Sequence, residues 1–136
     1  MRGRVSVEDM TATVVERVGS GSVRRRVSVD DYARVCVEVL GAELTAYVAG
    51  ADTVAEFDSW FRAPAQPAEV QRRLAAAAEI VSVFEMANQS AYASAWLREM
   101  DEVGYVPARV LRQSTGDEIS VKSLLEASVA FTLGRN

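Results

Sequence analysis

The stretch ADTVAEFDSWFRAPAQP, from Ala51 to Pro67, decides how the first half of the chain is interpreted. Asp52 or Thr53 is suited to cap a helix, because its side-chain oxygen accepts a hydrogen bond from a free N–H of the first turn. Pro64 and Pro67 end that helix, since proline lacks a backbone N–H. The stretch therefore predicts a short helix between a polar turn and a proline-rich exit. Its apolar side chains recur at helical spacing: Val54, Phe57, Trp60 and Phe61.

Two further helices are predicted just before this stretch. One runs from Val29 to Leu40, after a Ser-x-x-Asp capping pattern and before a glycine suited to a helix C-cap. The other lies in AELTAYVAG and ends at Gly50, with Leu44, Tyr47 and Val48 on one face. Three short helices joined by tight turns are typical of a helix-turn-helix layout.

Residues 1–28 are an N-terminal extension that the sequence leaves open. RVSVED at Arg4–Asp9 recurs as RVSVDD at Arg26–Asp31, which favours a capped helix over about residues 7–18. The same region is rich in β-branched residues, so residues 6–28 alternatively form a β-hairpin. The basic run Arg24, Arg25 and Arg26 follows a glycine-serine joint and is either a DNA-binding arm or a solvated charge run.

Four more helices are predicted after Pro67, over residues 69–87, 90–100, the segment PARVLRQ and residues 119–133. Pro107 suits the first turn of PARVLRQ. In the helix over 90–100, the side chains expected to point inward are Tyr92, Ala95, Trp96 and Met100. The fold class is therefore all-α. Residues 1–28 are the extension with its basic arm, 29–67 a helix-turn-helix-like segment, and 68–136 a C-terminal helical partner-binding region.

The composition narrows the classes of function. The 136 residues are 49% hydrophobic and carry a formal net charge of −4, which is typical of a globular protein and argues against indiscriminate polyanion binding. There is no histidine, so triads and histidine-ligated zinc sites are excluded, and we expect no catalytic residues, metal or cofactor. The lone Cys36 excludes an internal disulfide and favours a cytoplasmic location, and no apolar run is long enough to span a membrane.

The order of motifs from about Val37 to Asn136 resembles the Xre/MbcA/ParS-type antitoxins, which are the partners of RES-domain toxins. The motifs that carry the resemblance are FDSWFRAPAQP, QRRLAAAAEIVSVFEM and SAYASAWLREMDEVGYVPARVLRQSTGDEISVKSLLEA. The resemblance implies a helix-turn-helix segment followed by a toxin-binding region. It also implies a RES-type toxin as partner and an oligomer that binds operator DNA as an autoregulator.

The predicted recognition helix departs from that pattern. Family members present arginine or other donors to the groove, whereas the matching positions here are Ala55, Glu56 and Ser59, and no Lys or Arg occurs from Glu38 to Trp60. Carboxylates near phosphates cost affinity, and guanine readout uses Arg or Lys. The alternative function is therefore a protein-interaction module that has kept a helix-turn-helix-like scaffold and lost DNA binding.

The candidate site residues follow from these two readings. For DNA they are Arg24, Arg25, Arg26, Thr53, Ser59 and Arg62. For a protein partner they are Arg109, Arg112, Phe131 and Leu133. We expect Trp60 and Trp96 to lie in the core. The final segment, Ser128–Asn136, is expected to be dispensable for folding and to present Phe131 and Leu133 to the partner.

Overall fold

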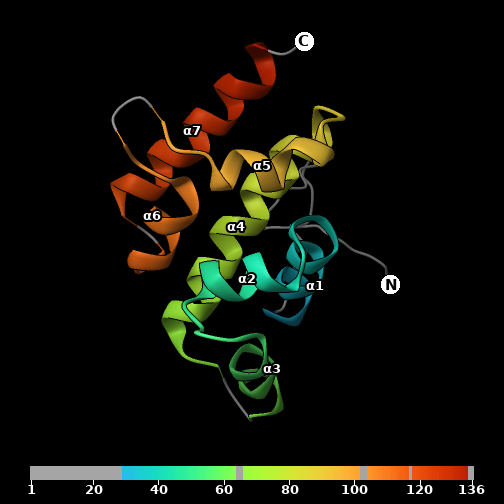
Figure 1. Cartoon of the computed structure of the whole chain (residues 1–136), viewed down its shortest axis with the longest axis vertical. Helices are drawn as coiled ribbons and strands as arrows, with labels where there is room; N and C mark the ends of the chain where they lie inside the picture. The colour runs from blue at the N-terminus through green and yellow to red at the C-terminus, as the bar shows by residue number, and fades with distance from the viewer. Residues whose placement is uncertain (1–28, 64–65, 102–103, 117, 135–136) are drawn as a thin grey trace, which may run out of the picture.

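The computed structural model describes residues 29–63, 66–101, 104–116 and 118–134, and these residues form an all-α bundle, as predicted (Figure 1). The predicted alternatives for residues 6–28, and the arginines at 24–26, lie outside the described residues. The elements in chain order are α1 (Val29–Leu40), α2 (Ala42–Ala49), α3 (Val54–Arg62), α4 (Ala68–Met86), the 3-10 turn η1 (Ser90–Tyr92), α5 (Ala93–Arg98), α6 (Pro107–Gln113) and α7 (Ile119–Gly134).

Local sequence signals set most of these boundaries. Gly50 ends α2 in the left-handed conformation, with φ of 102°, and its N–H bonds back to the last turn. The N-cap of α3 is Thr53, in extended conformation. Pro107 stands in the first turn of α6, where a missing N–H costs nothing. Six of the seven helices predicted after residue 28 therefore agree closely with the structure in their bounds.

The helix α4 is the centre of the molecule (Figure 1). It packs against α1, α2 and α7, and its residues Leu74, Ile80, Val81 and Phe84 are buried completely or almost so. The main core combines Ile80, Val81 and Phe84 with residues from α1, α2, α5, α6 and α7. Apolar burial of this kind supplies most of the favourable free energy of folding, and here it joins residues on both sides of Pro67.

A second cluster lies beneath α3. Phe57 is its buried aromatic side chain, in edge-to-face contact with Phe61 at a centroid distance of 5.1 Å. Trp60 is half-buried and packs against the same cluster, and Val70 connects the cluster to α4. The aromatic residues whose spacing predicts α3 are therefore the residues that attach α3 to the bundle.

The predicted helix over residues 90–100 differs from the structure. It opens with the turn η1 and ends at Arg98, and Tyr92, Ala95 and Met100 are exposed rather than inward. A 3-10 turn has three residues per turn instead of 3.6, so it rotates the face that follows it. The side chains that α5 buries are Ala93 and Leu97, and Trp96 lies half-buried against Phe84.

The end of α7 also differs from its prediction. Ser128 and Thr132 are buried, and the side-chain amide of Gln89 donates a hydrogen bond of 3.0 Å to the backbone oxygen of Thr132. Phe131 is half-buried, with its ring centroid 5.8 Å from that of Phe84 and 6.4 Å from that of Trp96. The expectation that Phe131 is exposed is therefore wrong, because its ring packs against the core. The burial of Ser128 and Thr132 indicates that the last two turns of α7 contribute to folding, against the expectation that this segment is dispensable for it.

Two polar groups between α1 and α4 have shifted acidities. Burial, and then the charge of Glu85, raises the pKa of the Cys36 thiol to about 12, so this cysteine is an inert core residue as expected. Partial removal from water, and then the charge of Glu38, raises the pKa of Glu85 above its ordinary value. The charged form of Glu85 is therefore disfavoured in the folded state.

We expect Glu85→Gln to raise the melting temperature at pH 7, since it removes a carboxylate that is less stable folded than unfolded. A raised folded pKa means that the stabilisation is present at low pH and is lost as pH rises from the unfolded to the folded pKa. Thermal melts between pH 4 and pH 8 should show that loss in the original chain and a flatter profile in the variant. Glu126→Gln, on the exposed side of α7, is the matched control. Equal effects of the two changes would contradict the prediction.

Candidate functional site

The helices α2 and α3 are joined by the four residues 50–53, the element order and turn length of a helix-turn-helix. The hydroxyl of Thr53 accepts a hydrogen bond of 3.0 Å from the N–H of Glu56, and the carboxylate of Glu56 accepts one of 2.7 Å from the N–H of Asp52. The Ser59 hydroxyl donates a hydrogen bond of 2.7 Å to the Glu56 carbonyl. The two hydroxyls predicted for DNA therefore already have partners within this unit.

The outward face of α3 is acidic. Glu56 and Asp58 are exposed there, and Asp52 and Glu43 are exposed nearby on the turn and on α2. Arg62, in the last turn of α3, is exposed as a DNA contact requires, and it is the single basic residue of that helix. Carboxylates on this face repel phosphates, so the geometry does not favour α3 as the element that reads DNA.

Arg112 on α6 binds the α2–α3 turn. Its guanidinium donates hydrogen bonds of 2.8 Å to the carbonyl oxygens of Tyr47 and Ala51 and one of 3.0 Å to the carboxylate of Asp52. It also lies over the Tyr47 ring, 4.7 Å from the centroid. Arg112 was predicted to face a protein partner, but the structure places it in contacts with its own chain.

Two arginines of α4 hold the same region. Arg73 donates hydrogen bonds to the carbonyl oxygens of Ala49, at 3.1 Å, and Ser114, at 2.7 Å, and Arg72 donates one of 2.9 Å to that of Thr115. Gly116 has φ of 100°, and a Cβ there would lie 2.7 Å from the Arg72 carbonyl carbon, so only glycine fits this approach. The α2–α3 turn and the α6–α7 connection are therefore fixed to one stretch of α4.

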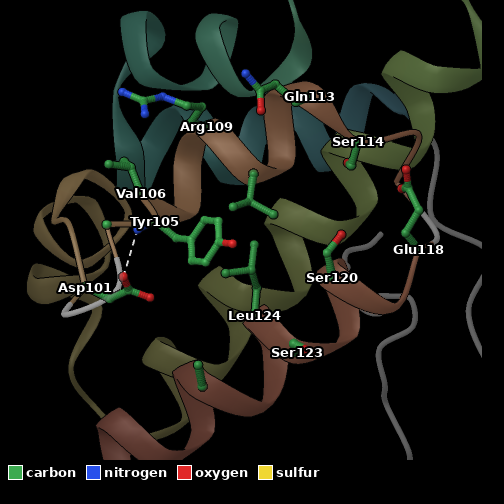
Figure 2. A pocket seen from close by; sticks show the side chains of 13 residues that line it. Asp101, Tyr105, Val106, Arg109, Gln113, Ser114, Glu118, Ser120, Ser123 and Leu124 are labelled. Carbon is green, nitrogen blue, oxygen red and sulfur yellow. Dashed lines mark hydrogen bonds between the residues drawn. The ribbon is translucent and has the colours of Figure 1, made fainter.

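A groove of about 620 Å³ lies between α6 and α7 (Figure 2). Its lining is mainly apolar, with Tyr105 and Val110 on the α6 side and Leu124 and Ala127 on α7. Figure 2 shows the Tyr105 ring directed into the space between the two helices, with Arg109 and Gln113 along the α6 edge. Tyr105 is 62% exposed, so a large aromatic side chain is accessible to a partner here.

Three charged residues line the groove, and two of them accept hydrogen bonds from nearby backbone N–H groups. The Asp101 carboxylate accepts a hydrogen bond of 2.8 Å from the N–H of Tyr105. The Glu118 carboxylate accepts one of 2.8 Å from the N–H of Thr115, and this bond lowers the pKa of Glu118. Arg109 forms no ion pair or hydrogen bond with any residue that the structure describes. Among the described residues that line the groove, Arg109 is therefore the charged residue without an ion-pair or hydrogen-bond partner.

The predicted partner-binding residues are thus not brought together. Arg109 lines the groove, whereas Arg112 binds the α2–α3 turn. Phe131 packs against the core, and Leu133 is 68% exposed near the end of α7. Tyr105 and Leu124 were missed as site residues. The available signal for Leu124 was its place in the i, i+3, i+4, i+7 set with Ser120, Ser123 and Ala127, which share one face of α7.

No cluster of three or more acidic, cysteine or histidine side chains suited to a metal ion occurs among the described residues. In the same part of the chain, no helix has the length and apolar character needed to cross a lipid bilayer. Comparisons with protein-family models, with curated proteins and with solved structures give no match to this chain.

Proposed function

We propose that this chain is an antitoxin-like protein that binds and neutralises a RES-type toxin, and that the groove between α6 and α7 is its partner-binding surface. The observation that carries the proposal is the groove itself: a mainly apolar hollow with an exposed aromatic side chain, Tyr105, and with Arg109, which has no ion-pair or hydrogen-bond partner among the described residues. Aromatic and arginine side chains at the centre of an apolar patch are the residues that most often carry binding energy between proteins. The toxin class comes from the sequence resemblance.

The alternative is an interaction module on a helix-turn-helix-like scaffold that no longer binds DNA. The acidic outward face of α3 supports it, as do the internal hydrogen bonds of Thr53 and Ser59. If the chain is also an oligomeric autoregulator, its DNA contacts would fall to the arginines at 24–26. Residues 1–34 hold seven arginines against five acids, whereas the rest of the chain has a net charge of −6.

The test is co-expression of the full chain with a RES-domain toxin, followed by affinity purification and a growth assay. We expect the toxin to co-purify and cell growth to be protected. We expect Tyr105→Ala to weaken binding by about tenfold or more, as loss of an interface anchor does. Because Tyr105 is exposed, this change should leave the melting temperature almost unchanged.

Tyr92→Ala is the matched control, since Tyr92 is also an exposed tyrosine but lies on η1 and does not line the groove. It should bind the toxin like the original chain. A toxin that does not co-purify would contradict the RES-type assignment. A toxin that binds the Tyr105→Ala variant with unchanged affinity would show that the partner docks outside the groove.

A further inference from the structure

One exposed face of α7 has the residue spacing of a coiled-coil seam. Five exposed residues follow one another in steps of three, four, three and four positions: Ile119, Lys122, Glu126, Val129 and Leu133. Such steps align side chains in one stripe along a helix, where a second helix can pack. We call these five residues the α7 stripe. None of them lines the α6–α7 groove, which takes its α7 residues from another face of the helix.

The α7 stripe is apolar at three positions and charged at two. Ile119 is 81% exposed and Leu133 is 68% exposed, so apolar surface flanks the two charges. Lys122 and Glu126 are one helical turn apart, yet neither forms an ion pair or a side-chain hydrogen bond with any residue that the structure describes. A lysine that precedes its glutamate in a helix is also the less favourable order for a pair within one helix. Both charges are therefore available to a partner.

A second copy of α7 matches the stripe when the two helices are antiparallel. Aligning Lys122 of one copy with Glu126 of the other also aligns Ile119 with Val129, because both pairs are centred on residue 124. A twofold axis then repeats each contact. A parallel pair would place each charge against a like charge, and an antiparallel shift of one heptad would place a charge against an apolar side chain. Charge complementarity therefore selects one orientation and one register.

We infer that two copies of the chain associate through α7 as an antiparallel two-helix coiled coil, with Lys122 paired with Glu126 and Ile119 packed against Val129 across the interface. The 16 residues of α7 span about 24 Å. Two helices of this length bury less surface than the interface of a permanent dimer, so we expect association to be weak and to depend on concentration. The inference concerns self-association and does not depend on what binds in the α6–α7 groove.

Sedimentation of the full chain between about 10 μM and about 1 mM tests the inference, and the average mass should rise from that of a monomer towards that of a dimer. Lys122→Glu and Glu126→Lys each replace two attractive contacts by two repulsive ones, so each should weaken association by about tenfold or more. An equimolar mixture of the two variants should regain association. In the mixed dimer, every contact between positions 122 and 126 joins opposite charges.

Arg62→Glu and Glu43→Lys are the matched controls, since they make the same two charge changes at exposed positions outside the α7 stripe and should leave association unchanged. A chain that stays monomeric up to about 1 mM overturns the inference. A dimer that both α7 variants form as readily as the original chain also overturns it, because the interface then lies elsewhere. A mixture that associates no better than either variant alone would exclude the antiparallel register. A monomeric chain whose capture of the toxin is lost in Lys122→Glu would assign the stripe to the toxin instead.

Discussion

A chain that ends at Ala127 is expected to be less stable than the full chain by about 3–5 kcal/mol, a large part of the about 5–15 kcal/mol that holds a typical domain folded. The truncation removes Phe131 from its contacts with Phe84 and Trp96 and uncovers the core that Ser128 and Thr132 close. It also deprives the Gln89 side chain of its acceptor on Thr132.

Urea denaturation, followed by tryptophan fluorescence and by circular dichroism, is the measurement, with the full chain as reference. Leu133→Ala is the control, since Leu133 is 68% exposed and its truncation should change stability by about 0.5 kcal/mol or less. A truncated chain that unfolds at the same urea concentration as the full chain would mean that the last two turns of α7 contribute nothing to the core.

Arg112→Ala is expected to cost about 2–3 kcal/mol, because it removes a charged donor from the carbonyl oxygens of Tyr47 and Ala51. It also removes the cation–π contact with the Tyr47 ring. Arg112→Lys keeps the charge but lacks the second nitrogen, which donates to Asp52, and the planar group that lies over the Tyr47 ring, so it should recover only part of the loss. Hydrogen exchange should become faster at the amides of residues 50–53 before the core amides respond.

Asp52→Asn separates the ion pair from the backbone contacts. The Asp52 side chain is 85% exposed, so its pair with Arg112 is screened by solvent and should contribute less than about 1 kcal/mol. If Asp52→Asn destabilised the protein as much as Arg112→Ala, the ion pair, rather than the carbonyl contacts, would be what holds the turn.

The helices were predictable because their signals are local. The helix ends are set by residues that act within one turn of the chain, namely Thr53, Gly50 and Pro107. The spacing of the aromatic residues in α3 predicts which face of that helix packs against the bundle. The burial of Ser128 and Thr132 was not predictable from polarity. Their hydroxyls donate to the carbonyls three residues earlier, at 2.6 and 2.9 Å, so each polar group is satisfied inside its own helix and can face the core.

The candidate site was less predictable because it depends on tertiary placement. Arg109 and Arg112 are three residues apart and share a helix, yet one stands on a groove and the other binds a turn some 60 residues earlier in the chain. No spacing rule within α6 distinguishes them. Tyr105 lies in a turn, where the sequence has no periodic pattern that would predict the direction of a side chain. The groove itself depends on α7 lying beside α6, which is a tertiary contact.

The contacts of Arg112 also bear on how fast the chain folds and unfolds. The hydrogen bond from Arg112 to Ala51 joins residues 61 positions apart, whereas each helix forms from residues within a few positions of one another. The packing of α2 against α6 closes the loop between them, and the Arg112 side chain can bind the turn only once these helices lie side by side, so we expect this contact to form late. A contact absent from the transition state slows unfolding without speeding folding. Arg112 is therefore expected to set the lifetime of the native state, and hence the resistance of the chain to degradation during brief exposure to heat, more than the rate at which a new chain folds.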